Sequence, residues 1–368
     1  MHILMTTDTA GGVWTYTREL ARGLTLRGDR VTLVSFGPPP TREQKSWLED
    51  APDVTFLETN FRLEWMQDSA EDIDASRQWL RAAVARVRPD LVHLNQYAYG
   101  DLDYGVPKLI VAHSDVVSWW VSVHRELPRE NPRLRWYCDL VVRGISHADA
   151  VVAPSQWMLD AVRRYYVWPD CAGVIHNGRD GAFFSQQMTK EDFVLSVGRV
   201  WDQGKQVSLL GRTRFPVPVY VAGPDRPPEG TGSSAFAEHP GIRILGACSE
   251  EQLRSWYARA STYAATSRYE PFGLAPLEAA LSRCALVAND IPVFHELWGD
   301  AAFYFRANDA GSLGSAVRFL QAHADLRQHF AERAYERAAQ KFSTARMLDQ
   351  YQQLYRTLLE GGGRRWSN

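Results

Sequence analysis

The chain has 368 residues with 41 basic and 43 acidic side chains, which gives a formal net charge of −2. A nearly neutral chain lacks the basic excess that broad nucleic-acid binding requires. Its 45% hydrophobic and 23% charged residues are typical of a globular protein and exclude a mostly disordered one. No apolar run approaches the roughly 18–20 residues of a membrane span, and the length predicts two domains.

The cysteines and the N-terminus predict a cytoplasmic protein. Cys138, Cys171, Cys248 and Cys284 lie far apart, without a CxxC pair or a histidine at zinc-ligand spacing, so we expect reduced thiols. The short apolar start is followed at once by the polar residues 6–8, which does not match a signal peptide.

Short apolar segments alternate with amphipathic ones in the first half of the chain, as in βαβ units of a parallel sheet. The predicted strands are residues 2–6, 30–36, 54–58, 91–95, 108–113, 150–153 and 173–176. The predicted helices are residues 12–26, 74–88, 132–147 and 155–166.

The same pattern restarts after a polar stretch, residues 177–190, that reads as an interdomain linker. The second set of predicted strands is 193–197, 217–222, 242–245, 262–265, 285–288 and 302–305. Helices are expected at 203–210, 250–259, 274–282 and 309–324, and two long ones at 325–341 and 343–359.

This layout predicts an α/β protein with two Rossmann-like, doubly wound domains facing a central cleft. We expect residues 1–178 to form the first of these domains and 179–342 the second. A helix at 343–360 should pack back on the first domain, and 361–368 should be a flexible tail. Open parallel sheets bind ligands at the carboxyl ends of their strands.

The most informative segment runs from Ser267 to Ala280, SRYEPFGLAPLEAA. It places Glu270 in the loop after a predicted strand and Glu278 two turns into the following helix. Gly273 lets the main chain approach a ligand at the start of that helix, where free N–H groups favour an anion. From the spacing alone, two roles stay open for the glutamates: binding sugar hydroxyls, or simple charge capping of the helix.

This segment resembles the E-x7-E signature of the retaining family-4 glycosyltransferases of the GT-B fold, a glycogen-synthase-like superfamily found in bacteria. The resemblance extends over the whole chain. The other motifs that carry it are Gly11-Gly12, His113, Ala153-Pro154-Ser155, His176-Asn177-Gly178, Gly198-Arg199 with Lys205, and Pro292-Val293-Phe294-His295-Glu296.

The resemblance implies roles for these residues toward a nucleotide-diphosphate sugar, with UDP or GDP as the nucleotide. Glu270 would contact the donor sugar and Glu278 the ribose diol, while Arg199 and Lys205 would bind the diphosphate. The main chain of Phe272, Gly273 and Leu274 would add N–H donors. Gly11 and Gly12 would come close to the diphosphate, and His113 would contact the donor sugar near its anomeric carbon and position the sugar 6-hydroxyl. The resemblance also implies that the first domain, 1–178, binds the acceptor and that the second, 179–342, binds the nucleotide sugar. His113, Glu270, Arg199 and Lys205 are therefore the candidate catalytic residues.

Three other motifs are rejected. Gly11-Gly12 lacks the third glycine of a dinucleotide fingerprint, and the 198–205 segment has the wrong spacing and residue types for a P-loop. Asp101-Leu102-Asp103 matches a D-x-D metal motif, but it lies in the first domain, away from the expected nucleotide site. The resemblance implies no metal and no cofactor beside the substrate.

The acceptor site is less well defined by the sequence. Trp119, Trp120 and Asp115 are candidates, within an aromatic and basic stretch that also contains His124, Arg125, Arg129, Arg133, Trp136 and Tyr137; residues 61–66 form a second aromatic cluster. Aromatic faces suit sugars, and arginines suit lipid phosphates or anionic headgroups. The alternative is core packing beside a solvated basic face.

The expected function is transfer of a hexose, with retention, from the nucleotide sugar to an acceptor hydroxyl in bacterial polysaccharide, glycan or glycolipid synthesis. The acceptor would be a saccharide or a lipid-linked sugar, and a lipid-linked one would bring the protein to the periphery of the inner membrane. Two alternatives remain: a GT-B sugar-nucleotide 2-epimerase, and a non-catalytic protein that binds sugar nucleotides.

Overall fold

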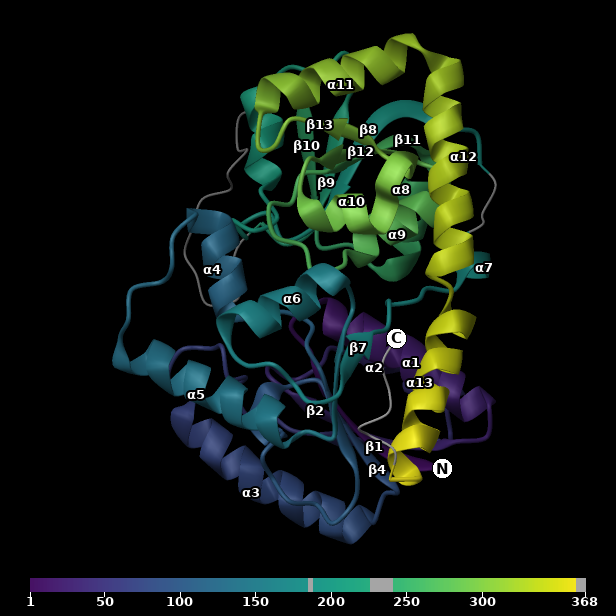
Figure 1. Cartoon of the computed structure of the whole chain (residues 1–368). Coiled ribbons are helices and arrows are strands. Elements are labelled where there is room, and N and C mark those ends of the chain that lie inside the picture. Colours follow the sequence, from purple (N-terminus) through teal and green to yellow (C-terminus); the bar gives the residue numbers. More distant parts are fainter. Residues whose placement is uncertain (185–187, 226–240, 362–368) are drawn as a thin grey trace. The chain divides into compact units, whose positions relative to one another are not determined.

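The computed structural model describes residues 1–184, 188–225 and 241–361 (Figure 1). The chain forms two compact units. Unit 1 comprises Met1–Trp120, Glu126–Gly178 and the stretch from Thr344 onward, and unit 2 comprises Val121–Arg125 and Arg179–Ser343. Most of the predicted tail, 362–368, lies outside the described residues.

The described part of unit 1 holds a seven-stranded parallel sheet in the order β3-β2-β1-β4-β5-β6-β7. Its strands are β1 (His2–Asp8), β2 (Arg30–Phe36), β3 (Val54–Glu58), β4 (Leu91–Leu94), β5 (Lys108–Val111), β6 (Ala150–Ala153) and β7 (Ala172–Val174). Its helices are α1 (Gly12–Leu26), α2 (Arg42–Lys45), α3 (Ala70–Val87), α5 (Pro132–His147), α6 (Gln156–Tyr165) and α13 (Thr344–Leu359), with the 3₁₀ helices η1 (Ser46–Asp50) and η2 (Tyr97–Tyr99). Helix α4 (Val116–His124) belongs to unit 1 as far as Trp120, and its residues from Val121 onward belong to unit 2.

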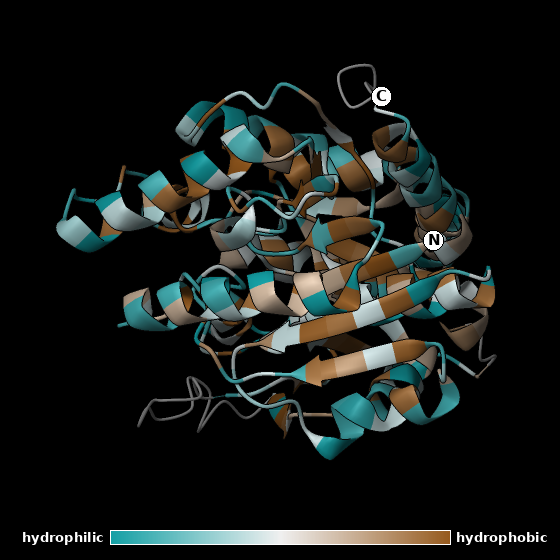
Figure 2. Cartoon of the chain, turned by 90° about the horizontal axis from the view of Figure 1, so that it is seen from below, coloured by the Kyte–Doolittle hydropathy of each residue, from teal (hydrophilic) through white to brown (hydrophobic). Residues whose placement is uncertain are grey.

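Helices cover both faces of this sheet, which explains why its strands are mostly apolar rather than alternating. One face packs against α1 and α13 through Tyr16, Leu20 and Tyr351, and the opposite face packs against α3, α5 and α6 through Leu80, Val141 and Met158. In Figure 2 the strands are largely hydrophobic, whereas the helices carry hydrophobic and hydrophilic residues on different faces. The C-terminal helix α13 thus supplies part of the core of unit 1.

The described part of unit 2 holds a six-stranded parallel sheet in the order β10-β9-β8-β11-β12-β13. Its strands are β8 (Glu191–Val197), β9 (Val219–Ala222), β10 (Ile242–Gly246), β11 (Ala260–Ala265), β12 (Ala285–Asn289) and β13 (Phe303–Phe305). Its helices are α7 (Gly181–Phe184), α8 (Glu250–Arg259), α9 (Leu274–Leu281), α10 (Pro292–Trp298), α11 (Ala310–Ala322) and α12 (Ala324–Lys341), with η3 (Val207–Arg212) and η4 (Gly299–Ala301).

One expectation about local structure is wrong, and several helices were not expected. Residues 203–210 do not form an α-helix, because the Asp202 side chain accepts a hydrogen bond from the Gly204 N–H at 2.8 Å and Gln206 adopts a left-handed φ of 49°. Only a 3₁₀ helix follows, from Val207. The predicted linker, 177–190, includes the boundary between the two units at 178/179, and it also contains α7, whose Phe184 is fully buried. The sequence pattern also gave no sign of α4 and α10, which are short and apolar.

Candidate functional site

The loop after β8 is organised around one carboxylate. Asp202 is 7% exposed and forms an ion pair with Arg199 at 2.6 Å, while its main-chain oxygen accepts from the Lys205 N–H at 3.0 Å. Burial alone would raise the pKa of Asp202, but the charges of Arg199 and Lys205 lower it below its ordinary value. Asp202 therefore stays ionised and holds both predicted diphosphate ligands in one turn.

The Lys205 side chain connects this loop to the E-x7-E segment. Its Nζ lies 2.5 and 2.7 Å from the two carboxylate oxygens of Glu270, which also accepts from the Ser267 hydroxyl at 2.9 Å. The main-chain N–H groups of Arg268 and Tyr269 both donate to the Gly204 carbonyl, at 2.9 and 3.2 Å. The structure thus brings Arg199, Lys205 and Glu270 together at the carboxyl ends of β8 and β11.

Gly273 opens helix α9 beside this cluster. Its φ of 92° and ψ of 88° are unfavourable for other residues, and a Cβ atom there would lie 3.0 Å from Cγ of Glu270. No side-chain cap is present at Gly273, so the N–H groups of Leu274 and Ala275, the two donors of the first turn before Pro276, retain their capacity to donate. Phe272 is buried against Phe342 with ring centroids 5.3 Å apart, so of this residue only the main chain is suited to contact a ligand.

Glu278 lies about one turn along α9 and is buried beside a cation that the sequence analysis missed. Its Oε1 is 3.0 Å from Nε of Arg179, which is 2% exposed and forms a second ion pair with Glu250. Burial and the Glu278 charge both raise the pKa of the neighbouring Tyr257. Arg179 directly follows the His176-Asn177-Gly178 motif, and this neighbourhood is the sequence signal that could have marked it as a residue of the site.

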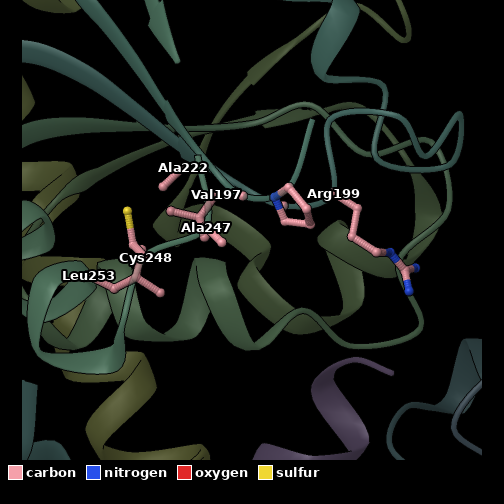
Figure 3. A pocket seen from close by; sticks show the side chains of 9 residues that line it. Val197, Arg199, Ala222, Ala247, Cys248 and Leu253 are labelled. Carbon is pink, nitrogen blue, oxygen red and sulfur yellow. The ribbon is translucent and has the colours of Figure 1, made fainter. Parts of the chain in front are cut away.

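A cavity of about 240 Å³ lies next to Arg199 at the carboxyl ends of β8, β9 and β10 (Figure 3). The residues that line it are Val197, Gly198, Arg199, Ala222, Gly223, Pro224, Ala247, Cys248 and Leu253. Gly223 has a φ of 138°, and a Cβ atom there would lie 1.9 Å from the Gly198 oxygen, so only glycine permits this close approach of two strand ends. Except for Arg199 and Gly198, the sequence analysis did not single out this lining.

The predicted residues of unit 1 lie at the carboxyl ends of its central strands. Gly11 and Gly12 are exposed at the start of α1, directly after β1. His113 follows β5, and its Nε2 lies 2.8 Å from Oδ1 of Asn95, the residue after β4. Desolvation lowers the pKa of His113 to about 3, so its imidazole is neutral near pH 7.

The acceptor candidates are placed by the structure in and around α4. Asp115 is buried at the start of this helix, where it accepts from the Ser118 N–H and the Tyr166 hydroxyl, each at 2.7 Å. Burial raises the pKa of Asp115. Trp119 and Trp120 are half-buried residues of the same helix. The contacts of Asp115 make it a helix cap, and they account for its burial without a ligand.

Other parts of the two aromatic stretches contribute to the core of unit 1. Leu63 and Tyr137 belong to its buried cluster, and Phe61, Met66 and Trp136 pack against it. Asp101 of the rejected D-x-D motif forms an ion pair with Arg77 at 2.6 Å, and Asp103 accepts from the Gly105 N–H at 3.0 Å. Within the described residues, no group of three histidine, cysteine, aspartate or glutamate side chains is placed to hold a metal ion.

The fold of the whole chain is that of the GT-B glycosyltransferases. Sucrose-phosphate synthase from Thermosynechococcus elongatus superposes with a TM-score of 0.80 and 18% identity, over 98% of this chain and all of that one. The structure of Anabaena HepE in complex with UDP and glucose superposes with a TM-score of 0.74 and 18% identity, over 97% of this chain and all of that one.

Sequence comparisons identify the family. Residues 10–182 match the model of Glycosyltransferase Family 4, and residues 233–337 match that of Glycosyl transferases group 1. The chain is 24% identical to the O-antigen chain mannosyltransferase RfbU of Salmonella typhimurium over 52% of its own length and 56% of that protein's. It is 27% identical to the alpha-maltose-1-phosphate synthase of Mycolicibacterium smegmatis over 69% of its own length and 73% of that protein's. The chain belongs to the family-4 glycosyltransferases of the GT-B fold.

Proposed function

We propose that this protein is a retaining hexosyltransferase that moves a sugar from a nucleotide-diphosphate donor to an acceptor hydroxyl. The observation that carries the proposal is the Arg199–Asp202 and Lys205–Glu270 cluster at the start of α9, beside the cavity of unit 2. Two cations and free helix N–H groups are the chemistry that binds a diphosphate. Family membership and the UDP in the HepE structure support the same assignment.

In this mechanism the bond between the anomeric carbon and the diphosphate oxygen breaks, and a new bond forms to the acceptor oxygen. Arg199, Lys205 and the first turn of α9 stabilise the negative charge that develops on the departing diphosphate. Glu270 accepts hydrogen bonds from the sugar and Glu278 from the ribose. The acceptor proton passes to an oxygen of the departing phosphate, which requires no protein nucleophile. An α-linked donor then gives an α-linked product.

The donor would bind mainly to unit 2 and the acceptor mainly to unit 1. The acceptor would be a saccharide or a lipid-linked sugar. The reaction would then belong to bacterial glycan, polysaccharide or glycolipid synthesis, as the names of the two relatives suggest. Within the described residues no helix has the length and apolarity of a membrane span. For a lipid-linked acceptor we expect the protein to float with anionic liposomes, and a protein that stays entirely in the soluble fraction would contradict that acceptor class.

Incubation with UDP-, GDP- and ADP-sugars, with and without acceptors, tests the reaction. Release of nucleoside diphosphate that depends on an acceptor supports transfer. An epimerised donor would instead support a 2-epimerase, and binding without turnover a sugar-nucleotide-binding protein. Arg199→Ala should reduce turnover severely, and near-wild-type activity of this variant would refute the diphosphate assignment.

A thiol reagent tests whether the nucleotide occupies the cavity beside Arg199. Cys248 lines this cavity and is partly exposed, as is Cys138 in unit 1, whereas Cys171 and Cys284 are buried. In a Cys138→Ser background, UDP or GDP should slow alkylation of Cys248. Equal alkylation rates with and without nucleotides that stabilise the protein would place the nucleotide elsewhere.

A further inference from the structure

The orientation of the Asn95 amide is fixed by a group that can only accept a hydrogen bond. Its Nδ2 lies 2.5 Å from the main-chain oxygen of Thr6 in β1, the strand next to β4. The Asn95 N–H also donates to the Thr6 hydroxyl at 2.9 Å, so main chain and side chain are bound to the same residue. Asn95 is 8% exposed and Thr6 is fully buried. The amide oxygen Oδ1 must therefore point the other way.

Oδ1 points toward His113, and this contact determines where the imidazole carries its hydrogen. An amide oxygen only accepts, so at the 2.8 Å contact Nε2 of His113 must be the donor. Because burial lowers the pKa of His113 to about 3, the ring carries one hydrogen near neutral pH. That hydrogen is on Nε2, and Nδ1 presents a lone pair.

The ring itself is held in place from one side by Tyr16. The two rings meet edge to face with centroids 4.6 Å apart, and the Tyr16 hydroxyl is 3.3 Å from Nε2 of His93. No described residue forms a hydrogen bond with Nδ1 of His113, and the residue is only partly buried. The hydrogen-bonding capacity of Nδ1 is therefore left for a substrate.

We propose that Asn95 is a positioning residue that holds His113 as the Nε2–H tautomer, so that His113 accepts a hydrogen bond from a hydroxyl of the donor sugar. This inference rests on the proposed function, because it requires that a sugar reaches His113. A lone pair at Nδ1 selects a group that donates. It repels a carboxylate oxygen, so this position favours a neutral hexose over a uronic acid.

Nitrogen NMR of the free, ¹⁵N-labelled protein tests the role of Asn95 without any substrate. Couplings between ring nitrogens and carbon-bound protons distinguish the two tautomers, and comparison with His113→Gln identifies the signals of His113. We expect pure Nε2–H in the wild type and a mixture in Asn95→Leu, which removes the acceptor at similar size. Thr17→Val is the matched control. The Thr17 hydroxyl accepts from Nδ2 of Asn95 at 3.4 Å, a longer contact than that with Thr6, so its loss should leave the tautomer unchanged. A wild-type His113 protonated on Nδ1, or an Asn95→Leu protein with unchanged signals, would overturn the proposal.

Donor analogues test the hydroxyl selection. The substrates are the 2-, 3-, 4- and 6-deoxy derivatives of UDP-glucose, or of GDP-mannose if the wild type turns that donor over faster. With the wild-type enzyme, we expect one of these derivatives to have a kcat/KM about 3- to 10-fold below that of the parent sugar nucleotide. In Asn95→Leu this preference should be weaker, because only part of the mixture keeps the lone pair on Nδ1, while Thr17→Val should keep the full preference. An equal preference in wild type and Asn95→Leu would overturn the selection by His113. If no donor were turned over, the proposed function would fail, and the NMR result would still decide whether Asn95 sets the tautomer.

Discussion

The candidate groups of the two units are polar in different ways. In unit 2 they are ions held by ions: Arg199 by Asp202, Lys205 by Glu270, and Glu278 by Arg179. In unit 1 the groups around His113 are neutral and joined by hydrogen bonds, because burial keeps its imidazole and that of His93 uncharged. The difference matches two tasks: a diphosphate needs compensating charge, whereas a sugar hydroxyl needs a donor or acceptor in a defined direction. The following predictions test this contrast.

The largest effect is expected from the buried ion pairs of unit 2. Arg179→Met leaves Glu278 and Glu250 without their cation, and breaking a buried pair in this way should lower the free energy of unfolding by about 3–5 kcal/mol. Denaturant titration measures it. The control is Arg306→Met, which removes a 79% exposed arginine from an ion pair with Asp309 and should change stability by no more than about 1 kcal/mol. Equal effects in the two variants would contradict a special role for the buried pair.

Lys205→Met tests the charge requirement for catalysis. Loss of one preorganised donor at the developing charge should reduce kcat by about 100- to 1,000-fold, or roughly 2.7–4 kcal/mol. Release of nucleoside diphosphate in the presence of donor and acceptor is the measurement, and the exposed Lys341→Met is the control. A loss below about tenfold would show that Lys205 serves mainly to pair with Glu270 and contributes little to catalysis.

Lowering the pH should reduce the stability of unit 1, because the imidazole of His93 is buried there in its neutral form. The pKa of His93 falls from 6.5 to about 3 through burial, so the unfolded chain binds more protons below pH 6.5 and stability is lost as the pH falls toward 3. Glu64 acts in the opposite sense: burial raises its pKa from 4.5 to about 7, and its contribution is present below pH 4.5 and lost as the pH rises through 7. Comparison of variants separates the two groups.

From pH 6.5 to about 5, His93→Gln should lose about 2 kcal/mol less stability than the wild type, at roughly 1.4 kcal/mol per pH unit. Unfolding in denaturant at a series of pH values gives these losses. His147→Gln, a change at an exposed histidine of the same unit, should follow the wild type. Parallel curves for wild type and His93→Gln would mean that the pKa of His93 is the same in the folded and the unfolded chain, which would contradict this prediction.

The smallest effect is expected from a pair of glycines in unit 2. Gly273→Ala and Gly246→Ala each place a side chain at positive φ, 92° and 72°, at a cost of about 1 kcal/mol in stability. Only the alanine at 273 would press on Glu270, since no atom lies within 4 Å of a Cβ at 246. We expect similar melting temperatures and a selective loss of kcat/KM in Gly273→Ala. Equal activity in the two variants would argue against close approach of a ligand at Gly273.

The sequence predicted the elements that depend on local patterns. Helices 12–26, 132–147 and 250–259 and strands 30–36, 54–58 and 150–153 begin and end where expected, because apolar periodicity and capping residues act over a few positions. The helix expected at 203–210 fails because one side chain, Asp202, competes for the N–H groups of its own turn. Helix α4 was missed because its residues are apolar on most sides and give no periodic signal.

The site was predictable only where a motif marks it. Arg199, Lys205, Glu270 and Glu278 follow from the resemblance, but their partners do not. Asn95 reaches Thr6 and His113, which are 89 and 18 positions away in the chain, and Arg179 reaches Glu278 from another element. Such contacts are set by strand order and by helix packing, which a linear pattern does not encode.

The order of the two units along the chain has a consequence for synthesis on the ribosome. The main segment of unit 2, Arg179–Ser343, is inserted between two parts of unit 1, and the first and last residues of this segment form a parallel bridge. The core of unit 1 contains Met347, Leu348, Tyr351 and Leu354 of α13, which are translated after the whole of unit 2. The part of the N-terminal sheet that α13 covers must therefore stay exposed until the inserted segment has been made, and the nascent chain is open to aggregation or chaperone capture during that interval.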